Sequence, residues 1–159
     1  MGYVPRRSGG DIREQVAAAR RICFDTNTII YHLHRAEPYH EVIEQLFNTV
    51  RDGQKQAFVS VITELELLVR PFREGDGWEA EQVRIVLDGP GMHIVEMDRH
   101  VARMGAEIRA KRALSLADAT IVATAIYANC DVIVGNDARC AHRVRDIPYV
   151  LLDELVKER

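Results

Sequence analysis

The stretch Arg21-Ile-Cys-Phe-Asp25-Thr-Asn-Thr-Ile-Ile-Tyr-His-Leu33 decides the fold. Its first segment, residues 22–24, is apolar at every position, which is typical of a strand buried on both faces of a parallel sheet. The carboxylate of Asp25 follows at once, and a second apolar segment at 28–33 is expected to be a helix. Open α/β sheets bind their ligands beyond the carboxyl ends of the strands. Asp25 therefore lies where chemistry is expected.

The rest of the chain alternates between short β-type runs and amphipathic segments. Further strands are expected at 57–61, 93–97, 131–134 and 149–152, and helices at 38–53, 62–69, 78–87, 98–113 and 115–128. We expect Pro38 to be the first residue of its helix, Pro71 to stop the helix before it, and Asp98 to cap another. The pattern predicts a single α/β domain with a central, mainly parallel sheet of about five strands, flanked by helices.

Length and composition are those of one ordinary globular domain of 159 residues, with 47% hydrophobic and 28% charged residues. The formal net charge is only −3, so contact with nucleic acid would need a local basic patch. Three cysteines without a C-x-x-C spacing fit neither a disulfide framework nor a zinc site, which favours a reducing cytoplasm. No apolar run is long enough to cross a membrane. Residues 1–20 are expected to form a flexible leader and a short helix capped by Asp11, ahead of the domain at 21–159.

Several carboxylates should share one rim of the sheet. Four of them follow the ends of predicted strands: Asp25, Glu64, Glu66 and Asp137. Asp118 has no strand directly before it, but it begins a helix that is expected to start near the same rim. Taken alone, an acid in the first turn of a helix or in a turn has an ordinary structural explanation. Asp25 differs, because a carboxylate inside an apolar stretch needs a partner or a metal ion.

Clustered carboxylates repel one another unless a cation lies between them. Oxygen ligands without a nearby set of Cys or His favour Mg²⁺ or Mn²⁺ over zinc. One or two such ions would activate water for attack on a phosphodiester, and the spacing in the sequence leaves the number of ions open.

Four segments, taken in this order, resemble the PIN-domain ribonucleases, and among them the VapC-like toxins of toxin–antitoxin pairs. They are Phe-Asp25-Thr-Asn-Thr-Ile, Val-Ser60-Val-Ile-Thr63-Glu-Leu-Glu66-Leu, Leu-Ala-Asp118-Ala-Thr-Ile-Val-Ala-Thr-Ala and Asn136-Asp137. The resemblance implies a PIN-like domain over residues 21–159 that hydrolyses RNA with a divalent metal ion, Mg²⁺ or Mn²⁺. It also implies a homodimer and an antitoxin partner whose C-terminal segment covers the active-site groove.

The resemblance implies that Asp25, Glu66, Asp118 and Asp137 hold the metal and carry the catalysis. It also implies that Asn27 and Ser60 orient the carboxylates. Glu66 is preferred because the family pattern places Thr three residues after Ser and the acid three residues further on. Helix geometry does not decide between Glu66 and Glu64, so Glu64 is held in reserve.

Basic residues near the rim are candidates for contact with RNA phosphates, although each of them could simply belong to a solvated charged face. They are Lys111, Arg112, Arg139, Arg143 and Arg145.

One departure from the family pattern concerns the fourth acid. The family usually has Thr or Ser two residues before it, whereas this chain has Gly135, which removes a hydroxyl that could support Asp137 or a metal-bound water. Two alternatives therefore stay open. One is a non-catalytic PIN-like module that binds RNA or protein. The other is a haloacid dehalogenase-type phosphatase, suggested by Phe-Asp25-Thr-Asn-Thr28, although Asn27 stands where that family has its general-acid aspartate.

Overall fold

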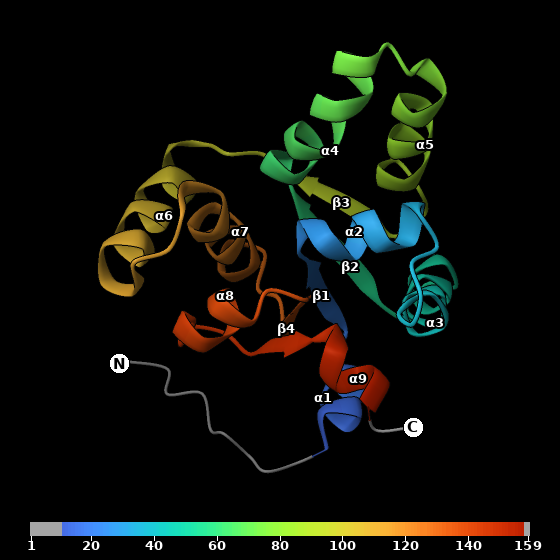
Figure 1. Cartoon of the computed structure of the whole chain (residues 1–159). Helices are drawn as coiled ribbons and strands as arrows, with labels where there is room; N and C mark the ends of the chain where they lie inside the picture. The colour runs from blue at the N-terminus through green and yellow to red at the C-terminus, as the bar shows by residue number, and fades with distance from the viewer. Residues whose placement is uncertain (1–10, 158–159) are drawn as a thin grey trace.

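The computed structural model describes residues 11–157 (Figure 1). Within this range the strands form one five-stranded sheet in the order β3-β2-β1-β4-β5, and every neighbouring pair is parallel. The strands are β1 Arg21–Phe24, β2 Gln56–Ser60, β3 Met92–Val95, β4 Val132–Gly135 and β5 Tyr149–Leu151. The predicted α/β domain with a parallel sheet of about five strands is confirmed.

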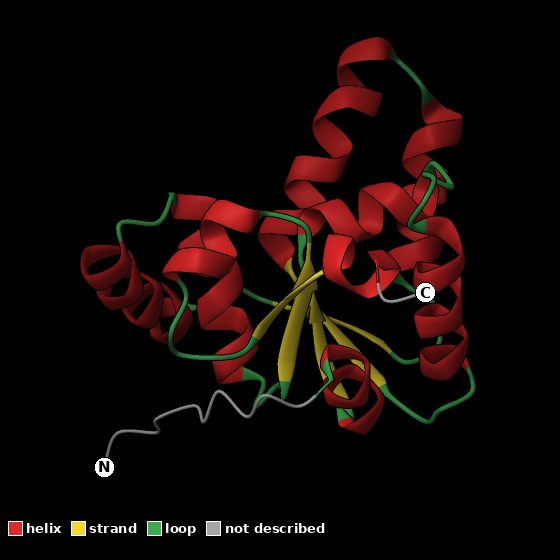
Figure 2. Ribbon diagram, turned by 60° about the horizontal axis from the view of Figure 1, so that its bottom comes forward, coloured by secondary structure: helices red, strands yellow, loops and turns green. Residues whose placement is uncertain are grey.

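Helices cover both faces of this sheet (Figure 2). They are α1 Ile12–Ala18, α2 Thr26–Leu33, α3 His40–Arg51, α4 Val61–Glu74, α5 Gly77–Leu87, α6 Arg99–Arg112, α7 Leu116–Tyr127, α8 Ala138–Arg143 and α9 Leu152–Lys157. Figure 1 shows α6 and α7 on one side of the strands and α2 and α3 on the other. Among the helices of residues 11–157, none combines the length and the apolar character that a membrane span requires.

The sheet separates two hydrophobic cores, because successive side chains of a strand point to opposite faces. In β1, Ile22 and Phe24 belong to the core that also contains Phe47 of α3. Cys23, between them, belongs to the other core with Val122 of α7. All three β1 residues are fully buried. This two-sided burial explains why the segment before Asp25 is apolar at every position.

Two predicted helix boundaries are wrong. α4 does not stop before Pro71 but continues to Glu74, and Gly75 closes it with a φ of 66°. A proline inside a helix costs about 3 kcal/mol or more. Here Leu67 and Pro71 are both buried and α4 packs along α5, which keeps the turn helical. α3 begins at His40 rather than at Pro38, and the peptide bond before Pro38 is cis.

Two short helices were absent from the sequence prediction. The six-residue helix α8 directly follows Asp137, and the six-residue helix α9 directly follows β5. Asp98 caps α6 as predicted, with its carboxylate accepting the Val101 N–H at 2.8 Å.

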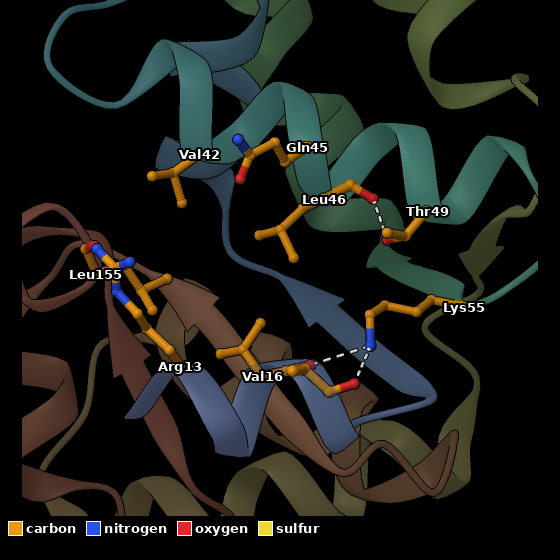
Figure 3. Close-up of a pocket in the computed structure, with 9 residues that line it drawn as sticks. Arg13, Val16, Val42, Gln45, Leu46, Thr49, Lys55 and Leu155 are labelled. Carbon is orange, nitrogen blue, oxygen red and sulfur yellow. Dashed lines mark hydrogen bonds between the residues drawn. The ribbon is translucent and has the colours of Figure 1, made fainter. Parts of the chain in front are cut away.

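The N-terminal helix α1 packs against the domain at the end of the sheet where β1 and β2 begin. Asp11 caps it as predicted, accepting the N–H of Arg13 at 2.9 Å, although the helix ends at Ala18. The Lys55 ammonium donates to the carbonyls of Val16 and Ala17, at 3.1 and 2.8 Å (Figure 3). A cavity of about 250 Å³ lies beside this lysine, between α1 and α3. The flexible leader expected at 1–10 falls outside the described residues.

Candidate active site

Asp25 lies at the carboxyl end of β1 and caps α2. Its Oδ1 accepts the N–H of Thr26 at 2.7 Å, and its Oδ2 accepts the hydroxyl hydrogen of Tyr149. The backbone N–H of Asp25 donates to the Val134 carbonyl at 3.0 Å, so strand pairing continues up to this residue. Only 5% of Asp25 is exposed. The cap of a helix and the end of a central strand thus hold a buried carboxylate in one orientation.

The electrostatic surroundings of Asp25 show that three acids converge. The pKa of Asp25 is raised from 3.8 to about 6, chiefly by burial, and the charges of Asp118 and Asp137 contribute to the rise. Hydrogen bonds from Tyr149 and Thr26 act in the opposite direction but do not offset the burial. Asp118 and Asp137 are therefore close enough to Asp25 for their charges to disfavour its ionisation.

Glu66 reaches the same place through Thr26. The Thr26 hydroxyl donates to Glu66 Oε1 at 2.9 Å and lies 2.9 Å from the hydroxyl of Thr63. Glu64 is half-buried in the first turn of α4. Residues two apart on a helix project about 200° apart, so Glu64 points away from the side on which Glu66 meets Thr26.

Asp118 and Asp137 begin two different helices. The Ser115 hydroxyl accepts the Asp118 N–H at 3.1 Å and caps α7, which leaves Asp118 in the first turn. Asp137 caps α8 and accepts the N–H of Cys140 at 2.9 Å. Asp137 thus begins a helix that was not predicted from the sequence.

The two residues expected to orient the carboxylates have different surroundings. Ser60 is fully buried and accepts the N–H of Ile62 at 3.2 Å, which caps the helix that carries Glu66. Asn27 is half-buried in the first turn of α2. The side-chain and backbone groups that hold the Asp25 carboxylate come instead from Tyr149 and Thr26.

The basic candidates for RNA contact differ in how much they are already engaged. Arg112 forms a two-point pair with the carboxylate of Asp146, at 3.1 and 3.3 Å. Arg143 donates to the Ala113 carbonyl. Lys111 is exposed, 3.9 Å from Glu107. Arg139 is exposed in the first turn of α8, two residues after Asp137. Arg139 thus has the most favourable position for a phosphate beside the acids.

The donor set of this rim fits a hard divalent cation in its chemistry, because every candidate ligand is a carboxylate oxygen. Burial chiefly raises the pKa of Asp25 and the negative charges of Asp118 and Asp137 add to the rise; a cation beside Asp25 would offset both effects. Among residues 11–157, no three His, Cys, Asp or Glu side chains already form a group that could hold a metal ion. An ion here would therefore take part of its coordination from water, as is usual for Mg²⁺.

Two cavities lie away from the acids. The one beside Lys55 is at the opposite end of the strands. A second, of about 540 Å³, lies between α2, α4 and α5 and is lined by residues of both charges, including Arg70 and Glu79. Arg70 is one helical turn beyond Glu66 on α4. The acids Asp25 and Asp137 lie at the carboxyl ends of β1 and β4 and line neither of these two cavities.

Sequence reasoning missed three hydroxyl side chains of the site, those of Thr26, Thr63 and Tyr149. Thr26 and Thr63 stood inside the quoted segments, and their alignment across two helices could not be read from either segment alone. Tyr149 is 124 positions from Asp25 in the chain. Its contact depends on β5 lying next to β4, for which no local signal exists.

Comparison with known proteins supplies the family. The family model described as "PIN domain" matches residues 22–146. No sequence among the curated proteins matches significantly. Solved structures with a similar fold include VapBC2 from Rickettsia felis bound to a promoter DNA fragment, with 14% identity and a TM-score of 0.68 over 82% of this chain and 98% of that chain.

Two further structures have comparable similarity. FitAcB from Neisseria gonorrhoeae is 22% identical, with a TM-score of 0.64 over 82% of this chain and 97% of that chain. VapC20 from Mycobacterium tuberculosis, a toxin that cleaves the sarcin-ricin loop, is 15% identical, with a TM-score of 0.61 over 78% of this chain and 98% of that chain. At these identities the likeness concerns the fold. The family match covers most of the chain, and the protein belongs to the PIN domain family.

Proposed function

We propose that this protein is a Mg²⁺- or Mn²⁺-dependent endoribonuclease that hydrolyses RNA phosphodiester bonds, and that it is the toxin of a toxin–antitoxin pair. The observation that carries the proposal is the convergence around Asp25. The charges of Asp118 and Asp137 act on this buried carboxylate, and Thr26 connects it to Glu66, because its backbone N–H donates to Asp25 and its hydroxyl donates to Glu66. PIN-family membership and the solved toxin structures of the same fold support the same activity.

The residues of the rim would have different roles in hydrolysis. A bound divalent ion supplies neutralising charge and water of lowered pKa for attack on phosphorus. Asp25 and Asp118 would hold the ion, with Glu66 and Asp137 as further oxygen ligands. Arg139, exposed beside Asp137, would bind the RNA phosphate and orient the scissile bond.

The experiment that tests the activity uses purified protein and a labelled single-stranded RNA. Cleavage is expected with Mg²⁺ or Mn²⁺, and it should disappear in EDTA and in both Asp25→Asn and Asp118→Asn. Asp88→Asn, an exposed acid at the end of α5, is the matched control and should cleave at the wild-type rate. Cleavage that survives in EDTA or in both variants would refute the metal mechanism. Absence of cleavage by the wild-type protein would favour the non-catalytic PIN module.

An antitoxin is the partner that we propose, because several solved structures of the same fold are toxin–antitoxin complexes. On α4, the helix that carries Glu66, the apolar side chains of Leu65, Val69 and Phe72 are exposed, Phe72 to 69%. Their spacing places them on one face of the helix. We propose that an antitoxin segment covers this face and the acids beside it.

Two measurements test this biological role. Expression of the wild-type protein in a bacterial host should arrest growth, whereas expression of Asp118→Asn should not. The product of a small neighbouring gene should co-purify with the protein and suppress both the arrest and the cleavage of RNA. Growth arrest by Asp118→Asn equal to that of the wild type would contradict a ribonuclease toxin.

Light scattering of the free protein should give the mass of a homodimer.

A further inference from the structure

Tyr149 has a position that the four acids alone do not explain. It is the first residue of β5 and pairs with Ile133 of β4. Its hydroxyl donates to Asp25 Oδ2 and accepts the backbone N–H of Asp137 at 3.3 Å. One hydroxyl group therefore connects two of the acids, Asp25 through its carboxylate and Asp137 through its backbone.

Gly135 provides the space that this hydroxyl occupies. A Cβ atom at position 135 would lie 2.2 Å from the Tyr149 hydroxyl oxygen and 2.7 Å from the Asp25 Cβ. Both distances are far below the van der Waals contact distance of carbon atoms. No side chain fits at position 135 while Tyr149 and Asp25 keep their places. Gly135 and Tyr149 are thus complementary, and a hydroxyl lies beside Asp25 and Asp137 although residue 135 carries none.

We propose that Tyr149 is a positioning residue of the metal site, and that its hydroxyl holds Asp25 and the start of α8 in the arrangement in which both acids face one ion. This inference rests on the proposed metal-dependent function. By donating to one oxygen of Asp25, the hydroxyl fixes the rotation of the carboxylate. By accepting the Asp137 N–H, it fixes where the fourth acid begins. A tyrosine is neutral, so it orients the carboxylate without competing with a cation.

The position of the Tyr149 hydroxyl favours a role in the site over a role in the fold alone. β5 is an edge strand of the sheet, and its first side chain reaches past β4 to the end of β1. The ring is half-buried, and its hydroxyl ends beside Asp25, which is 5% exposed. Tyr149 packs against the core that contains Cys23 and Val122, and its hydroxyl lies next to the crowded charges.

The test is calorimetric titration of the full chain with Mn²⁺. Tyr149→Phe keeps the ring and removes only the hydroxyl, and we expect its Mn²⁺ dissociation constant to rise about 10- to 100-fold. Tyr39→Phe is the matched control, since the Tyr39 hydroxyl donates to another carboxylate, Asp153, at 2.6 Å. Its Mn²⁺ affinity should stay within about twofold of wild type. RNA affinity in EDTA should be unchanged in both variants, which a general loss of structure would not allow.

The Mn²⁺ titration distinguishes the positioning role of Tyr149 from the proposed metal-dependent function. Wild-type binding of Mn²⁺ with equal affinity in Tyr149→Phe would overturn the positioning role and leave the proposed function standing. No Mn²⁺ binding by the wild-type protein would overturn both. If Tyr149→Phe does not fold, a crystal structure of the wild-type protein with Mn²⁺ decides. A Tyr149 hydroxyl still hydrogen-bonded to Asp25 supports the inference, and a ring turned away from Asp25 overturns it.

Discussion

Asp25→Asn should stabilise the metal-free protein at neutral pH and at the same time abolish RNA cleavage. In the folded protein the pKa of Asp25 is raised from 3.8 to about 6, chiefly by burial. That difference corresponds to about 3 kcal/mol at neutral pH, at which the carboxylate is charged. Asparagine removes the charge, but it also disturbs the hydrogen bond with Tyr149. Losing that bond would lower the free energy of unfolding by about 1 kcal/mol. The expected net gain in the free energy of unfolding is about 1–3 kcal/mol.

The stabilisation expected from Asp25→Asn depends on pH. Between about pH 4 and pH 6 the folded protein keeps a proton on Asp25 that the unfolded chain has released. The free energy of unfolding of the wild-type protein therefore falls as the pH rises through this window, and the contribution is constant above it. Asp25→Asn has no ionisable group at position 25, so its free energy of unfolding lacks this pH dependence. Its advantage over the wild type should be largest above pH 7 and less than half as large at pH 4.5.

Urea denaturation followed by circular dichroism in EDTA, at pH 7.5 and pH 4.5, measures both effects. Asp88→Asn, an exposed acid paired with Arg84, is the control and should change the free energy of unfolding by less than about 0.5 kcal/mol. Saturating Mg²⁺ should stabilise the wild-type protein but not Asp25→Asn. A variant less stable than wild type at pH 7.5, or an equal gain at both pH values, would refute the account of Asp25 as a desolvated, repelled carboxylate.

Four further variants test the roles of other residues. Glu66→Gln should lower kcat for RNA cleavage at least about 100-fold, whereas Glu64→Gln should change it by less than about threefold; equal losses would refute the choice of Glu66. Lys55→Met should lower the free energy of unfolding by about 1–3 kcal/mol in thermal denaturation, because buried carbonyls of α1 lose their donor, and it should leave kcat unchanged. Arg139→Ala should raise KM for RNA and weaken its salt dependence, with kcat nearly constant; an unchanged KM would remove Arg139 from the RNA surface.

The parts of the fold that the sequence predicted are those with a local cause. The apolar run before Asp25 reports burial on both faces of a central strand, and the residues after it begin a helix that Asp25 itself caps. The ends of parallel strands share one edge of the sheet, so the approach of Asp137 to Asp25 followed from the order of elements, and Asp118 reaches the same edge from the first turn of α7.

The parts that the sequence did not predict depend on contacts between distant segments. Pro71 continues α4 because the surrounding surface buries it, which local propensity cannot report. The hydroxyl of Tyr149 reaches Asp25 only because β5 pairs with β4 in one register. In the sequence, Gly135 stands where the resembled family usually has a hydroxyl side chain. In the folded chain, the Tyr149 hydroxyl occupies the space that a side chain at position 135 would fill. The hydroxyl beside Asp25 thus comes from Tyr149 of β5 and not from residue 135.

The central claim is that a divalent ion binds between the acids at the carboxyl ends of β1 and β4. Crystals grown with Mn²⁺, measured at wavelengths on both sides of the manganese absorption edge, test it most directly. We predict an anomalous difference peak within about 2.5 Å of carboxylate oxygens of Asp25 and of at least one of Asp118 and Asp137. A protein saturated with Mn²⁺ that shows its peaks elsewhere, and none beside Asp25, would contradict the claim.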